Sequence, residues 1–214
     1  KKFSKTFELQ NKALELSLFL SLPAALALIV GSEQITSALF GYGSFDKISV
    51  DKSAKALFYF SFGLPAFSLI KIFSTFLFAR NDTKTPFKFS LISVIINITI
   101  SLVFFSEVGF IIIPIATTIS SWFNGIILLI FVINKNYFKF SYIFIIQITK
   151  IILSNLIAIL IFYFLINFLQ SSLDYVSSYK FIFMTLIVLM TFISYIGISI
   201  IIKAFKISDI NLKY

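Results

Sequence analysis

Six long apolar stretches, separated by short polar segments, constrain the fold of this 214-residue chain more than any other feature. A helix needs roughly 20 apolar residues to cross a hydrocarbon layer of about 30 Å, and each stretch supplies them. None shows the alternation, in segments of about ten residues, that is typical of an outer-membrane barrel. The sequence therefore predicts an all-α, polytopic membrane protein with six transmembrane helices at about 12–31, 54–78, 87–106, 109–133, 142–169 and 179–203.

The composition supports a membrane protein and argues against an enzyme. Hydrophobic residues make up 59% of the chain and charged residues only 13%, with a mean hydropathy of +1.01, whereas a soluble domain has roughly a quarter of its residues charged. The chain contains no Cys and no His, so it has no thiolate or imidazole for metal binding or acid–base catalysis. We therefore expect no catalytic site, cofactor or metal centre.

The distribution of basic residues predicts the orientation. The net charge of +9 lies mostly between the apolar stretches, which indicates topology and membrane lipids as partners rather than nucleic acid. Only two basic residues fall in the segments 32–53, 107–108 and 170–178. The positive-inside rule places both ends of the chain in the cytoplasm, because 12 of the 18 basic residues lie on that side: Lys1, Lys2, Lys5, Lys12, Arg80, Lys84, Lys88, Lys135, Lys139, Lys203, Lys206 and Lys213.

Two lysines fall inside apolar stretches, where ionisable groups are costly and are functional candidates. Lys71 lies about seven residues from the cytoplasmic end of the second predicted helix, or roughly 10 Å. Its ammonium group either faces a cavity that receives an anionic substrate or reaches the membrane surface along its flexible stem. Lys150 is closer to the start of its helix, so reaching the surface is the favoured interpretation there.

Hydroxyl and amide side chains gather in the third and fourth predicted helices. Asn97 and Ser101 are one turn apart and share a face, and Thr117 begins a polar run in the next helix. Such residues bond neighbouring membrane helices to one another; alternatively, they line an aqueous cavity or hold a small cation such as sodium. The cluster contains no carboxylate, which argues against a strong cation site.

The loop between the second and third predicted helices is dense in polar residues. Thr85 followed by Pro86 predicts an N-cap and the first residue of a helix. Asp82 is expected to accept hydrogen bonds within the loop or to pair with Arg80. These residues predict a rigid cytoplasmic hairpin, and Arg80 and Lys84 are also suited to contact a phosphate group.

Prolines and glycines mark the predicted bends and turns. Pro23, Pro65 and Pro114 fall inside or near the start of three helices, where proline removes a backbone hydrogen bond and favours a kink. The stretch Gly41-Tyr42-Gly43 predicts a tight turn in the longest outer loop. Gly109 predicts a very short hairpin that makes the third and fourth helices antiparallel neighbours.

Three stretches of the sequence are similar to one known family. They read ARNDTKTP at 79–86, LSLPAALA at 20–27 and LFGYGSF at 39–45. In this order and spacing they resemble the MurJ (MviN) lipid II flippases of the multidrug/oligosaccharidyl-lipid/polysaccharide exporter superfamily. The likeness covers about residues 10–135 by motif, and beyond them it rests on the number and placement of helices.

The resemblance implies an architecture for the whole protein. The family has fourteen transmembrane helices, and this chain would supply helices nine to fourteen, as the carboxy-terminal part of a longer protein. Residues 1–135 would form four helices of the second transporter lobe. Residues 136–214 would form two additional helices that make a groove for a polyprenyl tail. The amino-terminal helices of the same protein would be its direct partners.

The resemblance also implies a function in the bacterial cytoplasmic (inner) membrane. The family moves an undecaprenyl-diphosphate-linked peptidoglycan precursor across the membrane by alternating access, coupled to sodium or protons. Lys71 would then be a cavity charge, and Arg80 and Lys84 would lie at the cytoplasmic mouth. Asn97 and Thr117 match a sodium site proposed for the family, whereas Ser101 stands where an acidic residue is expected.

Two other functions fit the same apolar helices. A related exporter, such as an O-antigen flippase, would have the same topology, although the motif at 79–86 favours the peptidoglycan branch. A non-transporting scaffold subunit would explain the helices without requiring Lys71 to face a cavity. Arginines embedded in the helices upstream of this chain would favour a flippase over a scaffold.

Overall fold

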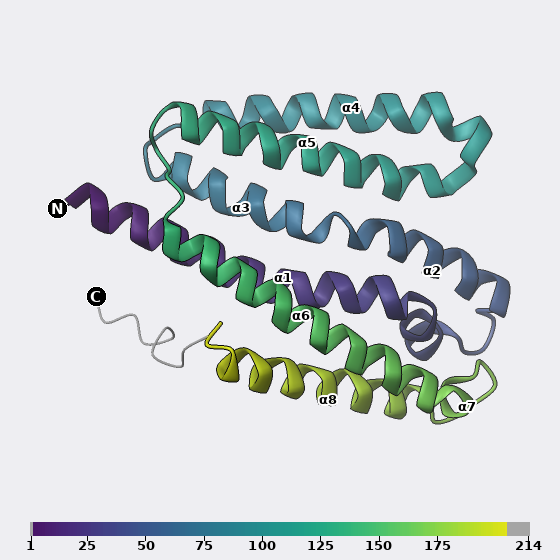
Figure 1. Cartoon of the computed structure of the whole chain (residues 1–214). Helices are drawn as coiled ribbons and strands as arrows, with labels where there is room; N and C mark the ends of the chain where they lie inside the picture. Colours follow the sequence, from purple (N-terminus) through teal and green to yellow (C-terminus); the bar gives the residue numbers. More distant parts are fainter. Residues whose placement is uncertain (1, 205–214) are drawn as a thin grey trace.

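The computed structural model describes residues 2–204, and every regular element within that range is a helix (Figure 1). This confirms the predicted all-α fold. Residues 205–214, which include the predicted cytoplasmic Lys206 and Lys213, lie outside the described residues. The elements are α1 (Lys2–Phe40), α2 (Lys47–Ser61), α3 (Leu64–Phe78), α4 (Lys84–Val108), η1 (Gly109–Ile111), α5 (Ile112–Asn134), α6 (Tyr142–Phe168), α7 (Gln170–Leu173) and α8 (Lys180–Ile201).

By length and composition, four helical stretches of the described chain can cross a membrane, and the bent pair α2–α3 makes a fifth. One of the four, Lys84–Asn134, has 51 residues. Straight, it would extend about 75 Å, far more than a hydrocarbon layer of about 30 Å. Figure 1 shows that it folds back into α4 and α5, which lie side by side. The crossing segments are therefore α1, α2–α3, α4, α5, α6 and α8.

Gly109 makes the reversal between α4 and α5 possible. Its φ of 72° and ψ of −153° lie in a region that residues with a Cβ atom rarely adopt. A single 3-10 turn, η1, follows before α5 begins at Ile112. Pro114 falls in the first turn of α5, where a missing backbone N–H costs little. The short hairpin predicted here is confirmed.

The first helix is longer than predicted and bends at a different residue. α1 reaches Phe40, beyond the predicted 12–31, because helical hydrogen bonding continues into polar residues on both sides of the apolar stretch. The backbone leaves helical dihedral angles at Gly31 (φ −107°, ψ 17°) rather than at Pro23. A Cβ atom on Gly31 would lie 2.8 Å from the Phe162 ring, so glycine allows α6 to pack against the bend.

The second crossing segment is broken into two helices. α2 and α3 meet at an angle of 42° around Phe62 and Gly63, and Pro65 lies in the first turn of α3. This confirms the bend expected near Pro65. α2 begins at Lys47 rather than at 54, because Asp46 caps it by accepting a hydrogen bond from a backbone N–H of its first turn.

The crossing segments pack in a row rather than around one central core. α4 packs on α5, α5 on the α2–α3 segment, that segment on α1, and α1 on α6, with α8 against α6 (Figure 1). Phe73, Leu77, Leu128 and Phe138 form a core where α3 and α5 meet the start of α1 and the α5–α6 connection. The pair α6 and α8 therefore joins the other helices chiefly through α1.

Candidate functional site

The break between α2 and α3 leaves backbone carbonyl groups that α5 binds. Thr118 Oγ1 donates to the Tyr59 carbonyl oxygen at 2.7 Å, and Trp122 Nε1 donates to the Phe62 carbonyl oxygen at 2.9 Å. Each half-helix has 15 residues, so the break lies near the middle of the segment. An unpaired backbone group in hydrocarbon is costly, and α5 therefore stabilises a break of the kind that many transporters use.

The polar cluster predicted in the third and fourth helices comes together between α4 and α5. Asn97 Nδ2 donates to Thr117 Oγ1 at 2.9 Å and reaches Ser120 Oγ at 3.4 Å. Ser93 Oγ donates to the Ser120 carbonyl oxygen at 2.6 Å. These contacts bond the two helices at two successive turns, as small polar residues do in membranes.

Ser101 stands apart from this network. Its Oγ atom is buried and has no hydrogen-bond partner among the described residues. Within the same part of the chain, no group of three or more Asp, Glu, His or Cys residues is placed to hold a metal ion. Asn97 directs its amide N–H toward Thr117, whereas a bound cation would require oxygen atoms there. The arrangement therefore bonds helices and leaves one hydroxyl group unpaired.

Lys71 lies on an exposed face of α3. Its Nζ atom makes no hydrogen bond or ion pair with the described residues, while the adjacent Ile70, Ile72 and Phe73 pack into the core. The ammonium group thus points away from the neighbouring helices of this chain. Both interpretations, a cavity outside the described helices and the membrane surface, are consistent with this position.

Arg80 joins two loops. Its guanidinium group donates to the Phe76 carbonyl oxygen at 2.9 Å and to the Tyr137 carbonyl oxygen at 3.1 Å, and it lies 4.7 Å from the centroid of the Tyr137 ring. These contacts hold the end of α3 against the α5–α6 connection. They give Arg80 a structural role that the sequence does not reveal, because Tyr137 is distant along the chain.

Asp82 caps α4. Hydrogen bonds from the Thr85 side chain and from the Thr85 backbone N–H, at 3.0 Å, hold the pKa of Asp82 below its ordinary value. Loop hydrogen bonding is thus confirmed as the role of Asp82. The expectation that Thr85 is the N-cap and Pro86 the first helical residue is wrong, because α4 already begins at Lys84. Lys84 is exposed at the helix start.

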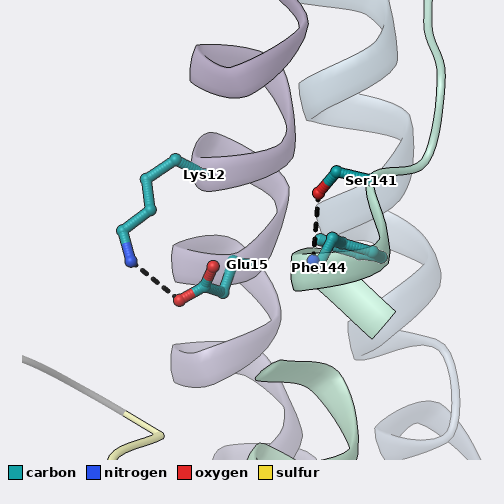
Figure 2. A network of polar contacts seen from close by, with 4 residues as sticks. All are labelled: Lys12, Glu15, Ser141 and Phe144. Carbon is teal, nitrogen blue, oxygen red and sulfur yellow. Dashed lines mark hydrogen bonds and ion pairs between the residues drawn. The ribbon is translucent and has the colours of Figure 1, made fainter. Parts of the chain in front are cut away.

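The start of α6 is fastened to α1 by a second set of polar contacts. Asn11 Oδ1 accepts a hydrogen bond from the Ser141 backbone N–H at 3.2 Å. Figure 2 shows Ser141 Oγ accepting in turn from the Phe144 N–H, near the Lys12–Glu15 ion pair on α1. Lys12 Nζ and Glu15 Oε1 are 2.8 Å apart, and the Glu15 side chain is nearly buried. The pair offsets the cost of placing Glu15 in an otherwise apolar helix.

Lys180 is a buried lysine that our sequence reasoning missed. It is 1% exposed, and its Nζ atom donates to the carbonyl oxygens of Gly41 and Tyr175, both at 2.6 Å. The centroids of the Tyr42 and Tyr175 rings each lie 4.5 Å from Nζ. Tyr175 also donates to the Phe45 carbonyl oxygen at 2.9 Å. A lysine at a helix start, with a tyrosine in each loop on the same side, was the only sequence signal.

The crossing helices are bent, broken and joined by hydrogen bonds between polar side chains. These features define a polytopic α-helical membrane protein of the transporter type. A sequence model of the family described as lipid II flippase MurJ matches residues 4–184. Curated relatives described as probable lipid II flippase MurJ are 38% identical over 117 residues in Rickettsia prowazekii and 42% identical over 120 residues in Rhizobium meliloti. These alignments cover 55% and 56% of this chain.

A solved structure is similar over more of the chain. The lipid II flippase MurJ in an inward closed conformation matches 92% of this chain with a TM-score of 0.75 and 25% identity. The chain belongs to the lipid II flippase MurJ family, as its motifs predict, and is a multi-pass protein of the bacterial inner membrane. It spans 23% and 22% of the length of the two curated relatives and 39% of the solved chain.

Proposed function

We propose that the complete protein is a lipid II flippase that moves an undecaprenyl-diphosphate-linked peptidoglycan precursor across the cytoplasmic membrane by alternating access. The observation that carries the proposal is the family match over residues 4–184, together with the likeness to a solved flippase. A polar headgroup and diphosphate cannot cross hydrocarbon unaided. The chain, as helices nine to fourteen with both ends cytoplasmic, would contribute part of the path.

In this proposal residues 1–135 belong to the moving lobe. Alternating access requires helices that bend while staying packed. The break at Phe62 and the bend at Gly31 supply two such places, and the Thr118 and Trp122 contacts satisfy the backbone at the first of them. The inward closed conformation of the solved relative supports a cycle of open and closed forms.

Residues 136–214 would form the lipid-facing pair that receives the polyprenyl tail. α6 and α8 expose large apolar side chains along their length, among them Phe164, Phe168 and Ile193. An apolar cavity of 210 Å³ lies between this pair and α1, lined in part by Pro23 and Phe162. An isoprenoid chain is suited to such a surface because it offers no hydrogen bonds and needs none.

Lys71 is the proposed cavity charge of this half, and Lys84 lies at the proposed cytoplasmic mouth. Both side chains are exposed, so they are available to a diphosphate or to the helices that precede this chain. Arg80 remains in the proposal only at the rim, because its guanidinium group already binds two carbonyl groups.

A coupling ion, sodium or proton, is part of the same proposal. The unpaired Ser101 hydroxyl beside the Asn97–Thr117 contact supports a ligand or an upstream side chain at that point. Sodium binding there would require the Asn97 amide to turn its oxygen inward and an acidic residue from outside this chain.

The test uses the complete gene in cells depleted of their own lipid II flippase. We expect wild type and Lys150→Ala to restore growth and Lys71→Ala to fail, at equal membrane abundance. Lys150 is the matched control because it also lies in an apolar helix near the cytoplasmic end. Restoration by Lys71→Ala would assign Lys71 to the membrane surface. Failure of well-expressed wild type, with rescue of an O-antigen export defect instead, would favour the related exporter.

A further inference from the structure

A polar cleft opens where the ends of α1 and α6 meet the start of α2, at the opposite end of the molecule from Lys71 and Lys84. The cavity between these ends has a volume of 490 Å³, within the range of about 300–1,000 Å³ typical of small-molecule sites. The cleft has no part in the function proposed above. The residues that line it are Glu33, Gln34, Ser37, Lys47, Val50, Asp51, Ile166, Gln170, Ser171, Leu173, Asp174 and Tyr175.

The bend of α1 positions the wall of this cleft. Gly31 interrupts the helix, and the turns that follow it leave the original axis and carry Glu33 and Ser37 toward α2 and α7. Figure 1 shows these last turns directed away from the rest of α1. On the opposite side, Lys180 fixes the loop that carries Asp174 and Tyr175.

Opposite charges line the cleft without neutralising one another. Glu33, Asp51 and Asp174 provide three carboxylates, and Lys47 provides one ammonium group. Glu33, Lys47 and Asp51 form no ion pair within the described residues, and the same three also line an adjoining cavity of 750 Å³ that contains Lys55. The lining of the cleft therefore has a net negative charge and contains one ammonium group.

Part of the cleft lining is apolar. Val50, Ile166 and Leu173 lie among the charged residues that line the cavity, which suits an amphiphile better than a fully polar solute. Ser37 also belongs to the lining, but its Oγ atom is buried and is not reached from the cleft.

The chemistry of the lining selects among ligands. The acidic residues of the described chain form no group able to hold a metal ion, and a purely anionic headgroup would meet three carboxylates. A primary ammonium group can donate three hydrogen bonds to carboxylates. A phosphate group in the same headgroup would accept hydrogen bonds from the lysine of the lining. α6 also exposes large apolar residues such as Phe168, 73% exposed, which suits contact with lipid chains.

We propose that this cleft binds the headgroup of phosphatidylethanolamine, with its ammonium group at Glu33 and Asp51 and its phosphate at Lys47. The lipid would occupy the angle between the bent end of α1 and the last helix pair. A lipid held there would bias the position of α6 and α8 relative to α1, whatever headgroup the transporter itself carries.

The test measures lipid retention by the complete protein in native mass spectrometry. The protein is placed in nanodiscs that contain phosphatidylglycerol, phosphatidylethanolamine and phosphatidylcholine, and it is then released from them for the measurement. The ethanolamine and choline lipids are present in equal amounts and have the same acyl chains. We expect the ethanolamine lipid to be retained about tenfold over the choline lipid, the equivalent of about 1.4 kcal/mol, because a quaternary ammonium group cannot donate hydrogen bonds. Glu33→Gln with Asp51→Asn should abolish the preference.

Glu107→Gln is the matched control, because Glu107 is exposed at the same end of the molecule but lies outside the cleft. It should keep the full preference for the ethanolamine lipid. Equal retention of the two zwitterionic lipids by the unaltered protein would overturn the proposal. So would a preference that survives in the doubly neutralised variant, or stronger retention of phosphatidylglycerol than of phosphatidylethanolamine. None of these results depends on whether the protein flips lipid II.

Discussion

Replacing Lys180 with methionine should loosen the last helix pair from the loop after α1. The substitution removes two hydrogen bonds of 2.6 Å, to Gly41 and Tyr175, and the contact of the ammonium group with two tyrosine rings. A hydrogen bond to a charged group contributes about 1.5–3 kcal/mol and a desolvated cation–π contact about 2 kcal/mol. Because methionine also avoids the cost of burying a charge, we expect a net loss of about 2–4 kcal/mol rather than the sum.

The assay is thermal unfolding of the purified complete protein in detergent, followed by intrinsic fluorescence. The shift in melting temperature per kcal/mol becomes smaller as a chain becomes longer, and for a protein several times the length of this chain it is about 1 °C. The melting temperature of Lys180→Met should therefore fall by about 2–4 °C. Lys52→Met removes an exposed lysine at the same end of the molecule and should shift the melting temperature by less than about 1 °C. Equal melting temperatures for Lys180→Met and the unaltered protein would refute the reasoning.

Three further predictions follow from individual contacts. Gly31→Ala should destabilise the protein by about 1–3 kcal/mol by displacing a packed ring, whereas Gly197→Ala, which meets open space, should be neutral or stabilising in the same unfolding assay. Asp82→Ala should lower the free energy of unfolding by about 1 kcal/mol at neutral pH. Folding lowers the pKa of Asp82, so the stability that Asp82 contributes is present above pH 3.8 and disappears as the pH falls below that value. The unaltered protein and Asp82→Ala should therefore become equally stable in acid. A double-mutant cycle of Asn97→Leu and Thr117→Val should give a coupling energy of about 0.6 kcal/mol, and strict additivity would disprove their bond.

The crossing helices could be predicted from the sequence because hydrocarbon sets a minimum apolar length. The same argument cannot place the ends of α1, since polar residues on either side remain helical without contributing to the apolar count. The bend at Gly31 also escaped prediction. The ring of Phe162 that packs against Gly31 is brought to this point only by tertiary packing.

The candidate site was predictable only where contacts are local or follow from the hairpin. Asn97 and Thr117 meet because a short turn forces their helices into antiparallel contact. Lys180 and Arg80 bind carbonyl groups 139 and 57 positions away in the chain. Any residue type can present a backbone carbonyl, so such partners leave no signature in the sequence.

The central claim is that the complete protein carries lipid II to the outer leaflet, and its most direct test is the sidedness of lipid II itself. In cells depleted of their own flippase, the complete gene would be expressed and lipid II on the outer surface measured by its cleavage with an externally added, membrane-impermeant hydrolase. We predict that wild type restores cleavage and that Lys71→Ala, at equal abundance, does not. Lipid II that stays protected in cells with abundant wild-type protein would contradict the account.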